Sequence, residues 1–441
     1  MERDLYLNKL ISRMDNGLVK VITGIRRCGK SYLVFTLFKK YLLEECKVPA
    51  EHVIELALDD DANSKYRNPM RLGEYLRSRI NGGSERFYLL IDEIQYCYRV
   101  KRDSTDESLV APEDRDSLYI TFYDVLNGLL RLDNVDIYVT GSNSKLLSDD
   151  VKTIFRGRGD ELRIHPFSFA EYHACIQGDK SDDWENYMAY GGMPLAVLEK
   201  NEARRRAYLV GLYDEVYLKD LVERNDIRDI PLLESLLDAL SSAVGSLTNP
   251  TRLANAINTI ARQKNTTANT IEQYIHYMVQ AFLFGKVKRY DVKGKSYFET
   301  PYKLYSEDVG LRNARLNWRQ QERTHLMENI LYNELVRLGY AVDIGVDNIE
   351  KRNGGGREMR QHEIDFVINQ GFDRFYIQSA FSLETEEKRE QELVPFRHCR
   401  DSFQKIIVTG ENEKMWKDEE GIVHIGVIPF LLDARAVLPS A

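Results

Sequence analysis

The sequence has no long apolar run, few cysteines and no low-complexity segment. No stretch approaches the roughly 18 uncharged apolar residues that a membrane-spanning helix needs, so we expect no membrane partner. The start, MERDLYLNKL, has acidic residues and no small-residue cleavage site, so no signal peptide is expected. The cysteines follow no paired spacing, which argues against a zinc site and indicates reduced thiols in a cytosol. They are Cys28, Cys46, Cys97, Cys175 and Cys399.

The composition is that of an ordinary globular protein, and the length exceeds what one hydrophobic core usually supports. The chain has 441 residues, of which 43% are hydrophobic and 29% charged. This length predicts two to four domains. The net charge of -8 argues against bulk, sequence-independent nucleic-acid binding, although charge can still be segregated by domain.

Short apolar runs alternate with helical patterns from residue 1 to about residue 165. This βαβα alternation predicts a parallel sheet with helices on both faces, in the α/β class. The charged stretch 100–116 lacks periodicity and is expected to be a flexible insertion. The predicted strands are 19–23, 52–58, 87–91 and 137–140, and the predicted helices are 31–45 and 118–132.

A phosphate-binding motif follows the first predicted strand. Residues 24–31 fit the pattern G-x-x-x-x-G-K-[ST] at every fixed position, between a strand and a helix. Gly24 and Gly29 allow the backbone to curl around an anion, Lys30 reaches the β and γ oxygens, and the Ser31 hydroxyl binds Mg²⁺. The predicted nucleotide-binding residues are Gly24, Ile25, Arg26, Arg27, Cys28, Gly29, Lys30, Ser31 and Tyr32.

Two acids end the third predicted strand, YLLIDE. Asp92 is predicted to hold Mg²⁺ through water, and Glu93 to polarise the attacking water. Acids at the end of a strand also occur as simple caps. The phosphate-binding motif some 60 residues earlier favours the catalytic interpretation, and the Asp-Glu pair favours hydrolysis over binding alone.

Polar residues after the fourth predicted strand complete the candidate site. Asn143, or Ser142, is predicted to hold the attacking water beside the γ-phosphate, although an ordinary polar turn would have the same composition. Arg158, in the run Arg156 to Gly159, is a candidate arginine finger that would act within its own chain or toward a neighbouring subunit. A surface arginine is the alternative for Arg158.

Taken together, these stretches resemble the AAA+ class, and in particular the archaeal-type ATPases that pair an AAA+ domain with a C-terminal domain of unknown function. The resemblance covers residues 1–315 well and the remainder more loosely. It implies ATP as the nucleotide, an AAA+ core over 1–165, a helical lid over 166–230, a winged helix over 231–315 and a nuclease-like domain over 316–441. The matching stretches are VITGIRRCGKSYL, YLLIDEIQ, YVTGSNSKLL, RGRGDELRIHPFSFAEY, GGMP and YDEVYLKDLVER.

The region 231–315 also reads as a winged helix from its residues alone. A helix around 253–257 precedes a second helix over 271–284 that Thr270 is expected to cap, and the alternating segment 285–305 predicts a hairpin wing. Residues 246–315 hold 11 Lys or Arg against 5 Asp or Glu, a local charge of +6, which makes duplex DNA a candidate partner. The alternative is a winged helix that serves packing or protein contacts.

Residues 326–410 resemble the restriction-endonuclease fold, whose acids bind Mg²⁺ while a lysine orients water. Glu328 or Glu334 would be the helix acid and Asp365, in Glu363-Ile-Asp365, the strand acid. Ala380 stands where the fold family has the lysine, and Gln378 replaces an acid. The departure favours a silent domain, unless Lys388 or Lys405 substitutes.

The sequence therefore predicts a Mg²⁺-dependent ATPase whose cycle moves the lid and the winged helix. One alternative is a nucleotide-gated regulator that binds DNA or protein with little turnover, and a weaker one is a nucleotide-gated nuclease. The motifs leave the oligomeric state open, because a ring with a trans arginine and a monomer with a nucleotide-gated lid both fit them.

Overall fold

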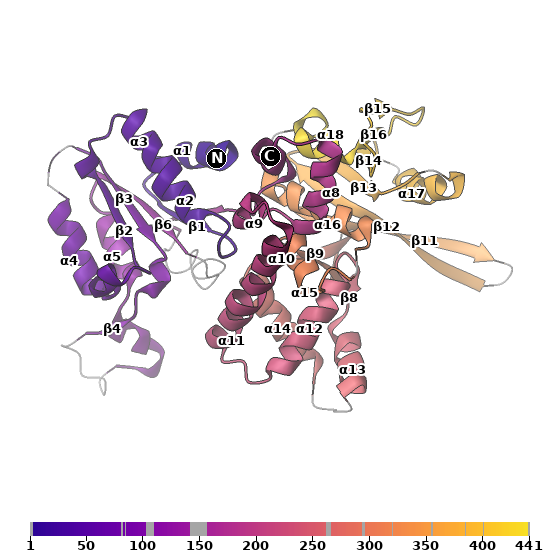
Figure 1. Cartoon of the computed structure of the whole chain (residues 1–441). Helices are drawn as coiled ribbons and strands as arrows, with labels where there is room; N and C mark the ends of the chain where they lie inside the picture. Colours follow the sequence, from indigo (N-terminus) through magenta and orange to yellow (C-terminus); the bar gives the residue numbers. More distant parts are fainter. Residues whose placement is uncertain are drawn as a thin grey trace. The chain divides into compact units, whose positions relative to one another are not determined.

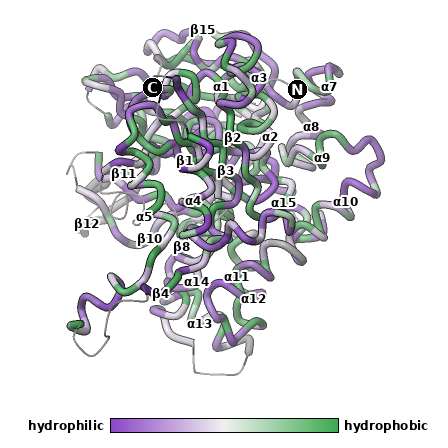
Figure 2. Tube along the Cα trace, turned by 90° about the vertical axis from the view of Figure 1, so that its left-hand side faces the viewer, coloured by the Kyte–Doolittle hydropathy of each residue, from purple (hydrophilic) through white to green (hydrophobic). Residues whose placement is uncertain are grey.

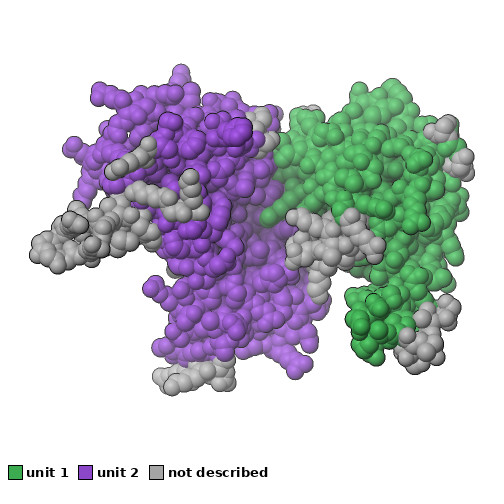
Figure 3. Space-filling model, turned by 180° about the vertical axis from the view of Figure 1, so that it is seen from behind, with its two compact units in different colours: residues 1–164 green, residues 165–441 purple. Residues whose placement is uncertain are grey.

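A computed structural model of the whole chain divides into two compact units, residues 1–164 and residues 165–441 (Figure 3). Each unit is considered by itself. The structure describes 3–80, 83, 85–102, 110–141, 157–261, 266–292, 296–319, 321–353, 356–383, 385–399 and 401–439.

A five-stranded, fully parallel sheet forms the centre of unit 1 (Figure 1). Its strand order is β2-β3-β6-β1-β7, so the phosphate-binding strand β1 lies between β6 and β7. The apolar run of β3 is green in the hydropathy colouring of Figure 2, and every residue of β3 is buried. The strands are β1 (Val19–Thr23), β2 (Val53–Ala57), β3 (Phe87–Asp92), β6 (Val135–Thr140) and β7 (Gly159–Arg163).

The strand β7 was not predicted from the sequence, because Gly-Asp-Glu-Leu-Arg has no apolar alternation. It occupies an edge of the sheet, where only one neighbour, β1, needs its backbone hydrogen bonds. The insertion contributes a short antiparallel pair, β4 (Val100–Lys101) and β5 (Tyr119–Ile120), and residues 103–109 lie outside the described residues.

Helices connect the strands of unit 1, as the alternating pattern predicted. The helix after the phosphate-binding motif runs from α2 (Lys30–Tyr32) through a π-helical segment, Leu33–Phe38, into α3 (Lys39–Glu44). A π-helical segment in this position is unusual and is frequent at functional sites. The remaining helices of the unit are α1 (Asp4–Ile11), α4 (Pro69–Arg79) and α5 (Phe122–Leu129).

A buried ion pair crosses the two central strands of unit 1. Lys20 on β1 contacts Asp136 on β6, and both side chains are buried. The second carboxylate oxygen of Asp136 accepts hydrogen bonds from the Tyr138 hydroxyl, at 2.8 Å, and from the Asp15 backbone N–H, at 3.0 Å. Because each charge is paired and hydrogen-bonded, a lysine is tolerated in a central strand.

Unit 2 begins with helices that pack side by side. Ser168 caps the first of them, with its hydroxyl accepting from the Glu171 N–H while the Glu171 carboxylate accepts from the Ser168 N–H. The helices are α7 (Phe169–Ile176), α8 (Lys180–Tyr190), α9 (Pro194–Leu198), α10 (Glu202–Gly211), α11 (Lys219–Asn225), α12 (Ile230–Ser242), α13 (Pro250–Ala261), α14 (Ala268–Gln280) and α15 (Val309–Arg315).

A nine-stranded mixed sheet, whose first three strands alternate with the last of these helices along the chain, has the order β15-β16-β14-β13-β12-β11-β9-β10-β8. Its strands are β8 (Leu247–Thr248), β9 (Phe284–Asp291), β10 (Tyr297–Ser306), β11 (Val342–Asn353), β12 (Gly356–Gln370), β13 (Asp373–Ala380), β14 (Gln404–Thr409), β15 (Trp416–Lys417) and β16 (Val423–Gly426). The accompanying helices are α16 (Arg323–Leu338), α17 (Glu386–His398) and α18 (Val427–Leu432).

The predicted hairpin wing is part of this large sheet. The strands β9 and β10 pair antiparallel, and β9 also pairs in parallel with β11 through Arg289, Tyr290 and Asp291. The second helix of this region begins earlier than predicted. Thr267, and not Thr270, caps it, because the Thr267 hydroxyl accepts the Thr270 N–H. The assignment of a separate winged-helix domain, and the four-part domain division, remain predictions.

A buried carboxylate, that of Asp308, is hydrogen-bonded to the backbone of the GGMP motif. Asp308 accepts hydrogen bonds from the Gly192 N–H at 2.7 Å and the Leu311 N–H at 3.0 Å. A Cβ on Gly191, whose φ is +68°, would lie 2.2 Å from an Asp308 oxygen, so only glycine fits there. Burial raises the pKa of Asp308 from its usual 3.8 to about 6.

The five cysteines are free thiols. Across the ranges that the structure describes, no helix combines the length and the apolar composition needed to cross a bilayer.

Asp308 gives unit 2 a pH-dependent stability that Asp308→Asn should remove. Between about pH 4 and 6 the native state holds a proton that the unfolded chain has lost, so wild-type stability falls relative to the variant as pH rises through that window. The full difference is about 3 kcal/mol. Urea unfolding followed by tryptophan emission measures it, because Trp184, Trp318 and Trp416 are the three tryptophans and all lie in unit 2. Parallel stability curves for the two proteins would contradict the assignment.

Candidate functional site

The phosphate-binding loop has the backbone conformation that its glycines predicted. Gly24 has a φ of +137° and Gly29 a φ of +99°, and Arg27 between them also has a positive φ, of +64°. A Cβ on Gly24 would lie 2.0 Å from the carbonyl oxygen of Ile164. The loop therefore packs against the residue that follows β7, and a side chain at position 24 would push it away.

Two cationic side chains hold the carbonyls of this loop. The Lys30 ammonium, only 4% exposed, donates to the carbonyl oxygens of Gly24 and Ile25, both at 3.1 Å. Arg3 is buried and donates to the Cys28 carbonyl at 2.9 Å. No sequence motif pointed to Arg3, because it precedes α1 and lies far from the loop in the sequence.

The predicted metal-binding residues meet beside the loop. Asp92 ends β3 and Ser31 begins the helix after the loop, and their side chains are hydrogen-bonded. The Thr140 hydroxyl at the end of β6 donates to the Asp92 carboxylate. Burial raises the pKa of Asp92, while the two hydroxyls favour its ionised form.

Glu93 lies next to Asp92 in an uncommon backbone conformation, with φ +51° and ψ 48°. Its N–H donates to the Thr140 hydroxyl oxygen at 3.1 Å, so Thr140 contacts both acids. The Gln95 amide donates to the Glu93 carboxylate. The sequence did not single out Thr140, although the parallel pairing of β3 with β6 puts the ends of these strands side by side.

The structure does not bring the other predicted residues into this group. Ser142, Asn143 and Arg156 lie outside the described residues. Arg158 is exposed, and its carbonyl accepts the N–H of Val19 at 2.9 Å, at the start of β1. The phosphate-binding loop follows the other end of that strand, so within its own chain Arg158 is not at the candidate site.

The register of β7 identifies a nearer arginine. Arg163 pairs with Thr23, the residue directly before the loop, whereas Gly159 pairs with Val19. The four residue steps between the ends of this strand span about 13 Å, which separates Gly159 from Arg163. A role for Arg158 toward a neighbouring subunit remains a prediction.

The residues around Asp92 fit a hydrated Mg²⁺ bound mainly by phosphate oxygens. Such an ion needs few protein ligands and usually keeps several waters. Ser31 offers a hydroxyl, and Asp92 a buried carboxylate whose raised pKa indicates that its negative charge is incompletely compensated. Among the described residues no three His, Cys, Asp or Glu side chains group as a metal site.

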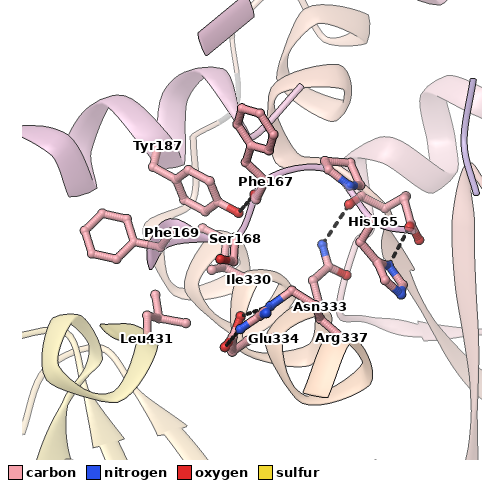
Figure 4. Close-up of a pocket in the computed structure, with 12 residues that line it drawn as sticks. His165, Phe167, Ser168, Phe169, Tyr187, Ile330, Asn333, Glu334, Arg337 and Leu431 are labelled. Carbon is pink, nitrogen blue, oxygen red and sulfur yellow. Dashed lines mark hydrogen bonds and ion pairs between the residues drawn. The ribbon is translucent and has the colours of Figure 1, made fainter. Parts of the chain in front are cut away.

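The motif HPFSF of the family resemblance belongs to unit 2 (Figure 4). His165 is hydrogen-bonded to Glu307 at 2.7 Å, with both side chains buried, and the Tyr187 hydroxyl donates to the Phe167 carbonyl at 2.8 Å. The Phe167 N–H donates to the Gly192 carbonyl, which links this motif to GGMP. The cavity that these residues line is about 20 Å³, room for one or two waters and not for a nucleotide.

The nuclease-like positions are only partly brought together. Glu328 on α16 and Glu363 and Asp365 on β12 converge, whereas Glu334 forms an ion pair with Arg337. Gln378 accepts the Asp365 N–H and donates to Glu392. Neither lysine considered as a substitute joins the carboxylates: Lys405 donates to the Cys399 carbonyl, and Lys388 is exposed on α17.

Comparisons with known proteins match two segments of the chain to sequence profiles and find relatives along most of its length. Residues 16–173 match the sequence profile of an AAA domain, and residues 181–322 match a domain of unknown function. An uncharacterized protein of Haemophilus influenzae is 29% identical over 438 residues, covering 98% of each chain. An uncharacterized protein of Methanocaldococcus jannaschii is 25% identical, covering 93% of this chain and 87% of its own.

Among solved structures, the Aeropyrum pernix ORC2 protein is 13% identical, covers 71% of this chain and 90% of its own, and has a TM-score of 0.33. A likeness at that level has no bearing on partners or activity. The parallel sheet, the loop at the end of β1 and the profile match together assign the N-terminal part. It is a P-loop domain of the AAA class, and the region after it matches a domain of unknown function.

Proposed function

We propose that the protein binds ATP with Mg²⁺ at the loop 24–31 and hydrolyses it. The contact of Ser31 and Thr140 with the Asp92 carboxylate is the observation that carries the proposal. A hydroxyl and an acid are the groups that a phosphate-bound Mg²⁺ would need beside the loop, which supports the proposal. Lys30 would exchange the carbonyls of Gly24 and Ile25 for the phosphate oxygens.

Hydrolysis, and not binding alone, is supported by Glu93. A carboxylate next to the metal-binding acid can accept a proton from the attacking water. Thr140 fixes the backbone N–H of Glu93, so the direction of this carboxylate depends on a hydroxyl from the neighbouring strand. Asn143 is proposed to position the water. Resemblance to archaeal-type ATPases favours ATP over GTP.

Nucleotide turnover is proposed to act on unit 2 as one body. Ile164, which packs on Gly24, is followed directly by His165, which is hydrogen-bonded to the buried Glu307. The predicted wing does not move separately in this proposal, because β9 is hydrogen-bonded to β11 as well as to β10. The proposed lid, winged helix and nuclease-like part would therefore shift together.

A nucleotide-gated regulator with slow turnover is the second candidate. Two contacts favour it: Lys30 is engaged by loop carbonyls, and the Glu93 carboxylate accepts a hydrogen bond from Gln95. Both contacts must break before catalysis. A low rate in the isolated protein that rises when a partner binds would favour this candidate over a freely running ATPase.

Duplex DNA remains a candidate partner through residues 246–315. The polar face of α14 supports it, because Gln273 and His276 are exposed there. The basic residues of the hairpin support it less, since Lys286 pairs with Glu272 and Lys288 with Glu299. We expect binding to duplex DNA only at low salt, and an absence of binding at low salt would end this candidate.

Glu93→Gln tests hydrolysis directly. The variant keeps the size of the side chain and loses the proton acceptor, so kcat for ATP should fall by about 100-fold or more. Binding of a fluorescent ATP analogue should stay close to wild type, whereas Lys30→Ala should lose it. Glu74→Gln, on the exposed face of α4, is the matched control and should change neither quantity. An unchanged rate in Glu93→Gln would refute the proposed role.

Thr140→Val tests the hydroxyl that contacts both acids. The substitution keeps the shape of the side chain and removes one donor to Asp92 and one acceptor for the Glu93 N–H. We expect kcat to fall by about tenfold or more, since one lost hydrogen bond to a charged group is worth about 1.5–3 kcal/mol. Thr140→Ser should restore most of the rate. Thr36→Val, on an exposed helical surface, is the control, and equal effects of the two valine variants would contradict the role.

A further inference from the structure

Three carboxylates of unit 2 surround one lysine that the sequence did not single out. The Nζ of Lys303, on β10, lies 2.8 Å from Glu328 Oε1, 2.6 Å from Glu363 Oε1 and 3.8 Å from Asp365 Oδ1. Lys303 is 4% exposed, and Glu328 and Asp365 are buried. The side chain of Glu363 is 30% exposed and forms the edge of the group. These four residues are called the lysine cluster below.

Further contacts satisfy the carboxylates of the lysine cluster. Glu328 Oε1 also accepts from the Tyr305 hydroxyl at 2.6 Å. Asp365 Oδ2 accepts the backbone N–H of Ser379 at 2.8 Å. The carboxylates therefore have donors on the protein itself, which is the condition under which buried charges are tolerated.

The charges within the lysine cluster compensate one another. Burial disfavours the ammonium, but Glu328 and the two strand acids outweigh this and raise the pKa of Lys303. Burial likewise opposes ionisation of Glu328, yet Lys303 lowers its pKa, whereas burial and then Glu328 raise the pKa of Asp365 well above its usual range. The Lys303 ammonium therefore lies where it offsets the negative charge of the acids around it, with Glu328 and Glu363 at hydrogen-bond distance.

The restriction-endonuclease resemblance implies Mg²⁺ at these acids, and the residues present do not fit it. The position between the three carboxylates is occupied by the ammonium of Lys303, which binds two of them at hydrogen-bond distance. Gln378, at the third acid's position, uses its carbonyl oxygen for the Asp365 N–H and its amide for Glu392. Ala380 supplies no lysine there.

We propose that Lys303 is a permanent internal cation that replaces the metal of this carboxylate group, so that unit 2 folds and works without a divalent ion there. Each carboxylate lies on a different segment from the lysine, with β10, α16 and β12 all represented. The lysine cluster thus joins the predicted winged-helix region to the C-terminal strands through one ammonium group. A metal nuclease activity at these residues is excluded by the same arrangement.

Removal of the lysine should turn the cluster into a cation site. Lys303→Ala leaves Glu328, Glu363 and Asp365 facing the vacated ammonium position, which a divalent ion can then occupy. We expect tryptophan-monitored melting of unit 2 in the full chain, without nucleotide and with EDTA, to fall by roughly 5–10 °C. Addition of Mn²⁺ should restore much of this loss in Lys303→Ala and leave the wild type unchanged. The matched control is Lys288→Ala, since Lys288 forms an exposed pair with Glu299 on the same hairpin, and it should show neither effect.

If Lys303→Ala does not fold, a second measurement tests whether the wild-type carboxylates bind a divalent ion. Mn²⁺ is titrated into the wild type and Glu363→Gln without nucleotide, and free Mn²⁺ is followed by electron paramagnetic resonance. The proposal expects no saturable site that depends on Glu363. A stoichiometric Mn²⁺ site in the wild type that Glu363→Gln abolishes would overturn the proposal, as would metal-dependent plasmid cleavage that Glu363→Gln or Asp365→Asn removes.

Discussion

The close approach of the phosphate-binding loop to Ile164 is the constraint on which much of unit 1 depends. The carbonyl of Ile164 takes the space that a side chain on residue 24 would fill, and the Cys28 thiol donates to the same oxygen at 3.5 Å. The Ile164 N–H donates to the carbonyl oxygen of Thr23, the residue directly before the loop. Ile164 is therefore hydrogen-bonded both to the end of β1 and, through Cys28, to the loop itself. A change in the loop backbone must therefore act on Ile164, and the next peptide bond leads into unit 2.

The chain uses buried acids in two opposite ways. In unit 1, the described side-chain hydrogen bonds of the Asp92 carboxylate come from hydroxyls, and we propose that its charge is used by an ion that arrives with the nucleotide. In unit 2, the cation that Glu328 contacts is the ammonium group of Lys303, a residue of the same chain. Under the two proposals, similar residue types would give one site that gains and loses an ion and another whose charge is fixed when the chain folds. The difference lies in the partner of the acid, which is a hydroxyl of the neighbouring strand β6 for Asp92 and the ammonium of a residue on β10 for Glu328.

Much of unit 1 could be predicted because its signals are local. The loop 24–31 and the acids Asp92 and Glu93 are short motifs at the ends of apolar strands, and the P-loop interpretation of the first of them is confirmed by the AAA profile. Contacts that depend on register could not be read from the sequence. Thr140 reaches Asp92 only because β6 pairs with β3, and Arg158 lies away from the loop only because β7 runs parallel to β1.

The same limit on predicting contacts from sequence applies to unit 2. The sequence predicts strands over 363–368, 375–379, 405–409 and 423–428, and β12, β13, β14 and β16 lie there, although β16 ends at Gly426. It does not predict β11. The positive charge of the region 246–315 suggested an exposed basic surface. Lys303 counted toward that charge although it is buried among acids, because composition reports how many charges there are and not which of them reach the surface.

The parallel pairing of β9 with β11 also limits which segment of the chain could be exchanged between proteins as one folded piece. The profile of unknown function ends at residue 322, between β10 and β11, whereas the backbone hydrogen bonds of the sheet continue across that point. A fragment cut there would expose the β9 edge and leave Lys303 without its carboxylates. Recombination at this boundary would produce two incomplete sheets, so the segment recognised by sequence similarity is shorter than the piece of chain that can be exchanged between proteins.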